Sequence, residues 1–135
     1  MRILIVEDEK KLADVIASRL RKEKYVVDIS CDGEEGLDNG LSNIYDLIIL
    51  DVMLPKMNGF EILNELRKKE IKSKIIMLTA KTLIEDKLNG FEKGANDYIT
   101  KPFHIEEVVA RVNVQLRNVD NTKINENIEF RWFKT

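Results

Sequence analysis

Short apolar runs alternate with segments of helical period along the first 118 residues of the chain. Runs rich in branched aliphatic residues predict strands, and three of them are almost continuously apolar, which is typical of strands buried on both faces of a parallel sheet. Five such runs are present: Arg2–Val6, Val26–Ser30, Leu47–Leu50, Lys74–Leu78 and Asp97–Thr100.

Between these runs, apolar residues recur three and four positions apart, which is the spacing of one helix face. The stripes are Leu12, Val15, Ile16 and Leu20; Leu63 and Leu66; Ile84, Leu88 and Phe91; and Ile105, Val108, Val109, Val112 and Leu116. A shorter helix is expected over residues 33–41, with Asp32 as its N-cap. Each stripe is interpreted as core packing.

This alternation predicts an α/β fold, with an open, doubly wound parallel sheet covered by helices on both faces. The pattern covers residues 1–118, which we expect to form one domain. Residues 119–135 begin with a polar stretch and then alternate Ile128, Phe130 and Trp132 with charged residues. So short a segment cannot fold alone. We expect a linker, a tail or the start of a truncated effector domain.

Composition narrows the possible functions. The chain has 135 residues, with 24 acidic and 22 basic side chains and a formal net charge of −2, which disfavours a dedicated nucleic-acid domain. No apolar run approaches the roughly 18 residues of a membrane span, and no signal-peptide core follows Met1. A single cysteine, Cys31, and a single histidine, His104, disfavour a disulfide and a zinc site. A cytoplasmic location is expected.

Polar residues follow the predicted strands at the edge where open α/β sheets bind ligands. Glu7 and Asp8 follow the first strand, Asp51 the third, Thr79 the fourth and Lys101 the fifth. Three carboxylates at one edge repel each other unless a cation joins them, and oxygen donors suit Mg²⁺ or Mn²⁺. A carboxylate beside such an ion, with a hydroxyl and an ammonium opposite, can accept a phosphoryl group. Taken singly, each residue could equally be a cap, a turn residue or a solvated side chain.

Four motifs together resemble the signature of receiver domains of two-component response regulators: Ile5–Glu9 (IVEDE), Asp51–Gly59 (DVMLPKMNG), Leu78–Ala80 (LTA) and Asp97–Phe103 (DYITKPF). The segment Gly90–Tyr98 is most similar to the OmpR/PhoB subfamily of transcription regulators. The resemblance implies a flavodoxin-like, CheY-like sheet of strand order 2-1-3-4-5. It also implies a histidine kinase partner and a DNA-binding output through a C-terminal domain not in this chain.

The resemblance further implies the chemistry of individual residues. Asp51 would be phosphorylated by the kinase. Asp8, Asp51 and the backbone carbonyl of Met53 would bind Mg²⁺ directly, with Glu7 acting mainly through water. Lys101, followed by a cis bond to Pro102, would pair with the acidic pocket and then with the phosphoryl group.

Two further implications concern the response to phosphorylation. Thr79 would move toward the phosphoryl oxygens while Tyr98 turns inward behind it, so that one local charge change biases a two-state switch. A homodimer would form through the fourth helix, fifth strand and fifth helix, with Lys87, Asp97, Glu107 and Arg111 at the positions of intersubunit ion pairs. Glu107 and Arg111 are also i, i+4 neighbours, so an intrahelical pair is an alternative. Asn96 stands where an aspartate is common, and Asn118 replaces a usual basic residue.

The preferred interpretation is a phospho-acceptor signalling module that is not itself an enzyme. Three other functions are alternatives to it. An aspartyl-phosphate phosphatase needs a second acid two residues after its nucleophile, where this chain has Met53. A flavin-binding module needs a phosphate-binding loop after the first strand, where this chain has acids. A stand-alone receiver, acting through protein contacts without DNA-binding output, remains open.

Overall fold

The computed structural model describes residues 1–80 and 94–117. Its five strands are β1 (Arg2–Val6), β2 (Val26–Ser30), β3 (Leu47–Asp51), β4 (Lys74–Ala80) and β5 (Asp97–Lys101). Its helices are α1 (Lys10–Lys22), α2 (Gly33–Leu41) and α3 (Gly59–Lys68), followed by a helix over residues 105–117. All strand pairs are parallel and the order is β2-β1-β3-β4-β5. The predicted fold class and strand order are confirmed.

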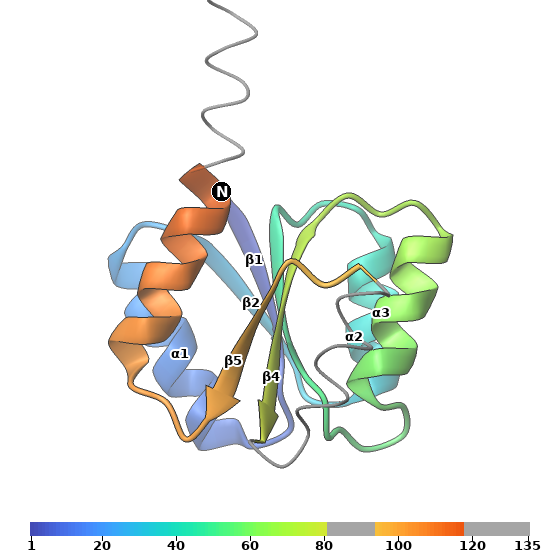
Figure 1. Cartoon of the computed structure of the whole chain (residues 1–135), viewed down its shortest axis with the longest axis horizontal. Helices are drawn as coiled ribbons and strands as arrows, with labels where there is room; N and C mark the ends of the chain where they lie inside the picture. The colour runs from blue at the N-terminus through green and yellow to red at the C-terminus, as the bar shows by residue number, and fades with distance from the viewer. Residues whose placement is uncertain (81–93, 118–135) are drawn as a thin grey trace, which may run out of the picture.

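Helices cover both faces of the sheet (Figure 1). On one face, α1 and the helix over residues 105–117 bury a cluster that includes Ile16, Leu20 and Val112. On the other face, α2 and α3 lie over a second cluster that includes Ile62 and Leu66. Because β1, β3 and β4 have covered faces on both sides, their sequences read as nearly unbroken apolar runs.

Three strands run further than their apolar residues predict. β3 continues to Asp51, β4 to Ala80 and β5 to Lys101. The extension arises because backbone pairing persists past the apolar side chains: Asp51 aligns with Leu78, and Thr79 with Thr100. The polar residues predicted to follow these strands therefore belong to them: Asp51 and Lys101 are the last residues of β3 and β5, and Thr79 is the last but one of β4.

The helix starts and stripes agree with the sequence pattern, with one exception. The side chains of Asp32 and Asn58 cap α2 and α3, accepting hydrogen bonds from the backbone N–H groups of Glu35 and Glu61 at 2.9 and 3.0 Å. The prediction that Val15 packs in the core is wrong, because its side chain is 54% exposed. Val15 lies on the flank of α1, one residue and therefore about 100° around the helix from the buried Ile16.

Part of the prediction lies outside the described residues. This applies to the stripe of Ile84, Leu88 and Phe91, and to the segment 119–135. Within residues 1–80 and 94–117, no helix has both the length and the apolar character needed to cross a bilayer.

Two arginines organise the amino edge of the sheet, which is the edge where its strands begin. Arg67 of α3 donates hydrogen bonds to the carbonyl oxygens of Gly94, Ile71 and Ser73 and to Oδ1 of Asn96, at 2.7–3.0 Å. Asn96 Oδ1 also accepts from the backbone N–H of Ile75 at 2.8 Å. Arg67 therefore ties the end of α3 to the starts of β4 and β5.

Arg2, the second arginine, lies at the start of β1. Its guanidinium donates to Asp28 Oδ2 at 3.2 and 3.3 Å, and its backbone N–H donates to Asp46 Oδ2 at 2.8 Å. The hydroxyl of Tyr45 also donates to Asp28, at 2.7 Å. These bonds join the starts of β1, β2 and β3.

Candidate functional site

Three acidic side chains meet at the carboxyl edge of the sheet, where its strands end. Glu7 and Asp8 directly follow β1, and Asp51 ends the neighbouring β3. Each offers a carboxylate oxygen within 4.8 Å of the others. Glu7 and Asp51 are only 1% and 3% exposed, whereas Asp8 is open to solvent. The sheet thus gathers the predicted acidic residues into one cluster with an accessible side.

Lys101, at the end of β5, reaches this cluster. Its Nζ lies 2.9 Å from Asp51 Oδ2 and 3.3 Å from Glu7 Oε1. Burial lowers the pKa of Lys101, but the hydrogen bonds and charges of Asp51 and Glu7 outweigh it and raise that pKa above its usual value. The peptide bond to Pro102 is cis, as the resemblance implied. The ammonium group therefore stays charged beside the acids.

Glu7 is the most perturbed acid of the cluster. Its pKa is raised from 4.5 to about 7, first because burial disfavours the charged form and then because Asp51 adds a hydrogen bond and a like charge. A hydrogen bond from the Glu9 N–H at 3.0 Å and the charge of Lys101 oppose that rise. Repulsion between the acids, which the sequence predicts, contributes to the raised pKa of Glu7, but burial is its larger cause.

Thr79 and Tyr98 lie behind the acidic cluster. Thr79, the last residue but one of β4, is buried, and within the part of the chain that the structure describes its hydroxyl makes a long 3.5 Å contact to the carbonyl oxygen of Ala80. Tyr98, on the neighbouring β5, is buried in the apolar cluster on the face of α2 and α3. In this structure the tyrosine ring already lies inward.

The loop between β3 and α3, residues 52–58, directly follows Asp51 and contains Met53. The backbone N–H of Met53 donates to Asp51 Oδ1 at 3.1 Å, and that of Gly59 donates to the carbonyl oxygen of Val52 at 2.8 Å. A Cβ at Gly59 would lie 2.3 Å from the carbonyl oxygen of Asp51, so only glycine allows this close return. The Met53 side chain is 69% exposed.

This donor set fits a hard divalent cation. Carboxylate oxygens are the ligands that Mg²⁺ and Mn²⁺ prefer, and three of them gather here around an open side marked by Asp8. Lys101 brings one positive charge to the three carboxyl groups, and a divalent cation bound there would reduce the repulsion between the acids further. The residues present therefore match the predicted Mg²⁺ or Mn²⁺ site.

The residues predicted for a dimer face pair within the chain. Arg111 Nη1 lies 2.9 and 3.0 Å from the two carboxylate oxygens of Asp97, and its Nε lies 3.2 Å from Glu107. The intrahelical alternative for Glu107 and Arg111 is thus the one seen here. Lys87 lies outside the described residues.

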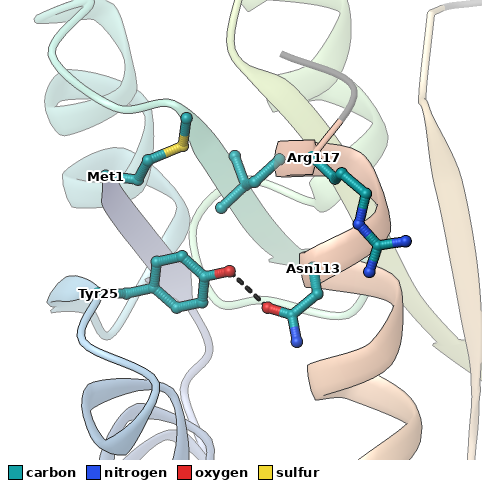
Figure 2. A pocket seen from close by; sticks show the side chains of 5 residues that line it. Met1, Tyr25, Asn113 and Arg117 are labelled. Atoms are coloured by element: carbon teal, nitrogen blue, oxygen red, sulfur yellow. Dashed lines mark hydrogen bonds between the residues drawn. The ribbon is translucent and has the colours of Figure 1, made fainter. Parts of the chain in front are cut away.

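A separate pocket lies at the amino edge, lined by Met1, Tyr25, Asn113, Leu116 and Arg117 (Figure 2). The Tyr25 hydroxyl donates to Asn113 Oδ1, and Asn113 Nδ2 lies 3.4 Å from Glu23. No acidic residue is among the described residues that line this pocket, in contrast to the acidic cluster of the carboxyl edge.

The sequence does not predict that the start of α2 contacts the loop 52–58. Its pattern indicates Asp32 and Gly33 only as the start of a helix, yet the N–H of Gly33 donates to the carbonyl oxygen of Pro55 at 3.1 Å. Lys56 Nζ lies 3.4 Å from Asp32. The Asp-Gly pair was the available signal, but nothing in the sequence indicates which loop it contacts.

A parallel five-stranded sheet of this order, with acids just after its first strand and at the end of its third and a lysine at the end of its fifth, agrees with the fold and residue placement expected of a receiver domain. The chain belongs to the response regulator receiver domain family, whose family model matches residues 3–113. It is thus the receiver domain of a two-component response regulator, as its motifs predicted.

Curated proteins similar in sequence to this chain are also response regulators or transcriptional regulators. The transcriptional regulatory protein DltR of Streptococcus agalactiae is 44% identical over 126 residues, which is 93% of this chain and 56% of the relative. The response regulator ArlR of Staphylococcus aureus is 51% identical over 116 residues, or 86% of this chain and 52% of the relative. These names agree with the predicted resemblance to transcription regulators. The chain spans about half the length of these curated relatives.

Solved structures show the same fold. The receiver domain of a Francisella response regulator superposes with a TM-score of 0.82 at 35% identity, covering 87% of this chain and 98% of that one. The non-phosphorylated HemR receiver domain from Leptospira biflexa gives 0.79 at 37% identity, covering 84% and 92%.

Proposed function

We propose that Asp51 of this receiver domain accepts a phosphoryl group from a histidine kinase in a Mg²⁺-dependent reaction. The observation that carries this proposal is the position of Lys101, whose ammonium lies 2.9 Å from Asp51 inside a cluster of three acids. A carboxylate held beside a fixed cation, and open on one side, can attack a phosphorus atom without losing its own position.

In this mechanism, a carboxylate oxygen of Asp51 forms the new bond to phosphorus as the bond to the kinase histidine breaks, and the histidine leaves with the electron pair. Asp8, Asp51 and the Met53 carbonyl would hold Mg²⁺, with Glu7 acting through water, and the bound ion would supply charge neutralisation. Lys101 stabilises the charge on the equatorial oxygens. The product is a changed conformation rather than a released metabolite, so the domain acts as a signalling module and not as an enzyme.

The switch that follows involves the two buried residues behind the site. Among the described residues, the Thr79 hydroxyl makes a long contact to the carbonyl oxygen of Ala80, so giving that contact up to turn toward a phosphoryl oxygen would cost little hydrogen-bond energy. Tyr98 lies on the adjacent strand opposite Met77, two residues before Thr79, so a movement of Thr79 would change the packing around Tyr98. The phosphoryl group thereby biases a two-state element.

Output is proposed to pass through a homodimer to DNA. Dimerisation on phosphorylation would use Lys87, Asp97, Glu107 and Arg111, and the two intrachain pairs of Arg111 would have to rearrange or be shared across the interface. Since curated relatives extend to about twice this length and one is a transcriptional regulatory protein, a DNA-binding domain beyond residue 118 is proposed, with residues 119–135 as its connection.

Intact-mass spectrometry tests the acceptor. The protein is incubated with Mg²⁺ and a small phosphoryl donor, beside an EDTA control and the variant Asp51→Asn. One added phosphoryl group that needs both Mg²⁺ and Asp51 is expected. A folded Asp51→Asn protein that still gains the group would place the acceptor elsewhere.

Lys101→Ala tests the link from site to output. The variant is expected to keep Mg²⁺ binding, since the acidic ligands remain, but to lose phosphorylation-dependent dimerisation measured by light scattering. Normal dimerisation of the phosphorylated variant would remove Lys101 from the switch.

A further inference from the structure

The start of α2 contacts the loop 52–58 that leaves the candidate phosphorylation site. The N–H of Gly33 donates to the carbonyl oxygen of Pro55 at 3.1 Å. Lys56 Nζ lies 3.4 Å from Asp32 Oδ2 and 3.9 Å from Glu34 Oε2. A helix that contributes no ligand is thus bonded to two consecutive residues of the loop.

Gly33 makes this approach possible because it has no side chain. A Cβ at this position would lie 2.1 Å from the carbonyl oxygen of Met57 and 2.8 Å from its Cβ. Both atoms belong to the backbone or are attached directly to it, so neither can swing aside as the end of a flexible side chain would. Any larger residue at position 33 must move the loop or the helix.

The other end of the loop is tied to the acceptor residue. Met53 donates its N–H to Asp51 Oδ1, and Gly59 returns to the carbonyl oxygen of Val52. The loop is therefore anchored to β3 at its base and to α2 at its middle. A displacement at Pro55 and Met57 has only a short path to the backbone of Met53.

α2 is itself a firm support. Asp32 accepts from the Glu35 N–H at 2.9 Å while it faces Lys56, and that hydrogen bond holds the pKa of Asp32 below its usual value. Gly36 and Gly40 let the helix pack closely on Val6 of β1 and Leu66 of α3. The position of the helix is set by the core rather than by the loop.

We propose that Gly33, assisted by the ion pair of Asp32 with Lys56, is a positioning residue for the metal and phosphoryl site. It holds the loop 52–58 in the shape that presents the Met53 backbone to the acidic cluster. This inference rests on the proposed function, because it assigns a support to the same site.

The test compares two glycines of the same helix in the full 135-residue chain. In Gly33→Ala the new methyl group meets the loop backbone, whereas in Gly40→Ala it meets only side-chain methyl groups of Leu66 and Ile48, the nearest at 3.0 Å. NMR titration with Mg²⁺ measures the dissociation constant, and thermal unfolding measures stability. Gly33→Ala should weaken Mg²⁺ binding by about tenfold or more, as is usual for a lost support of metal ligands, while Gly40→Ala stays near the wild-type value.

Lys56→Ala covers the case in which Gly33→Ala does not fold. Lys56 is exposed, so its removal leaves the core intact, and it should weaken Mg²⁺ binding by about twofold to fivefold, the range of an exposed ion pair. Amide hydrogen exchange in the metal-free protein should quicken in residues 53–57 of either variant.

The outcomes separate the two ideas. If wild type and Gly40→Ala bind Mg²⁺ and become phosphorylated while folded Gly33→Ala binds Mg²⁺ equally well, the positioning role is overturned and the proposed function stands. Unchanged Mg²⁺ affinity in Lys56→Ala removes the ion pair from the support. If wild type binds no Mg²⁺ at all, the proposed function fails and this inference fails with it.

Discussion

At the carboxyl edge of the sheet, three carboxylates gather and two of them, Glu7 and Asp51, share the ammonium group of Lys101, whereas at the amino edge the guanidinium groups of Arg2 and Arg67 are hydrogen-bonded. The carboxyl edge keeps Glu7 at a pKa of about 7, far from its ordinary value. The amino edge gives Arg67 four hydrogen-bond acceptors and Arg2 an aspartate. The same five strands thus end in two very different environments.

The difference between the two edges shows that this domain keeps an electrostatically unfavourable cluster of acids at its carboxyl edge. Natural sequences satisfy most local requirements and break them at functional sites. Crowded acids destabilise the carboxyl edge until a cation enters, so cation binding there relieves a cost that folding has created. At the amino edge, burial lowers the pKa of Arg67, but four hydrogen-bond acceptors surround its guanidinium and tie α3 to the starts of β4 and β5.

The largest expected effect breaks the amino edge. Arg67→Ala takes the arginine donor away from three carbonyl oxygens and removes one of the two donors to Asn96 Oδ1, and should lower the free energy of unfolding by about 4 kcal/mol. Urea denaturation measures it. The neighbouring Lys68→Ala, which loses only an exposed contact to Glu65, is the control and should be close to wild type. Equal effects in the two variants would contradict the structural role of Arg67.

The next effect concerns the pH dependence at the carboxyl edge. A Glu7 pKa raised from 4.5 to about 7 means that the folded state holds a proton that the unfolded state has released. The resulting stabilisation is complete below pH 4.5 and is lost as the pH rises through 7. It amounts to about 3 kcal/mol, at about 1.36 kcal/mol for each pH unit.

Glu7→Gln removes this titration and should leave the metal-free protein more stable than wild type at pH 8. Urea denaturation in EDTA between pH 5 and 8 measures the two curves, which should diverge as the pH rises. Glu9→Gln, an exposed neighbour, provides the control and should follow the wild type. Parallel curves for Glu7→Gln and wild type would show that Glu7 titrates normally.

A smaller effect should sharpen the comparison by improving the amino edge. Asn96→Asp keeps the acceptor for Arg67 and Ile75 but adds a negative charge, and should raise the free energy of unfolding by about 1 kcal/mol at pH 7. The arginine lowers the pKa of the new carboxyl, so the gain should disappear as the pH falls through that lowered value. A gain that persists at pH 2 would have another origin.

The smallest effect distinguishes the two arginines of the amino edge. Arg2 and Asp28 are both substantially exposed, so Arg2→Met should cost about 0.5 kcal/mol, much less than Arg67→Ala. The difference between wild type and Arg2→Met should shrink further in 1 M salt, which screens an exposed pair. A cost comparable to that of Arg67→Ala would mean that exposure does not determine the value of these charges.

The sequence predicted the fold well because its information is periodic. The buried strands β1, β3 and β4 show as apolar runs, and the cap Asp32 shows as a helix start. Strand ends were missed by one or two residues, since Asp51 and Lys101 pair through their backbones while their side chains are charged. The hydrophobic pattern of the sequence cannot show where backbone strand pairing continues through residues with polar or charged side chains.

The site was predicted in its members but not in its contacts. The placement of Glu7, Asp51 and Lys101 follows from strand topology, so their meeting could be anticipated. The contact of Gly33 with Met57 depends on how a loop folds against a helix more than 20 residues away, and no short-range pattern encodes that. The same holds for the intrachain bond of Arg111 to Asp97.

The two outer strands of the sheet share a device with a consequence for solubility. β2 and β5 are the edge strands, each five residues long, and each carries an aspartate held by an arginine: Asp28 by Arg2 and Asp97 by Arg111. Short edges that bear charge are poor templates for a further strand. Edge-to-edge strand pairing with a second copy of the chain is therefore disfavoured. Contacts between copies through side chains need not lead to fibre growth by strand addition.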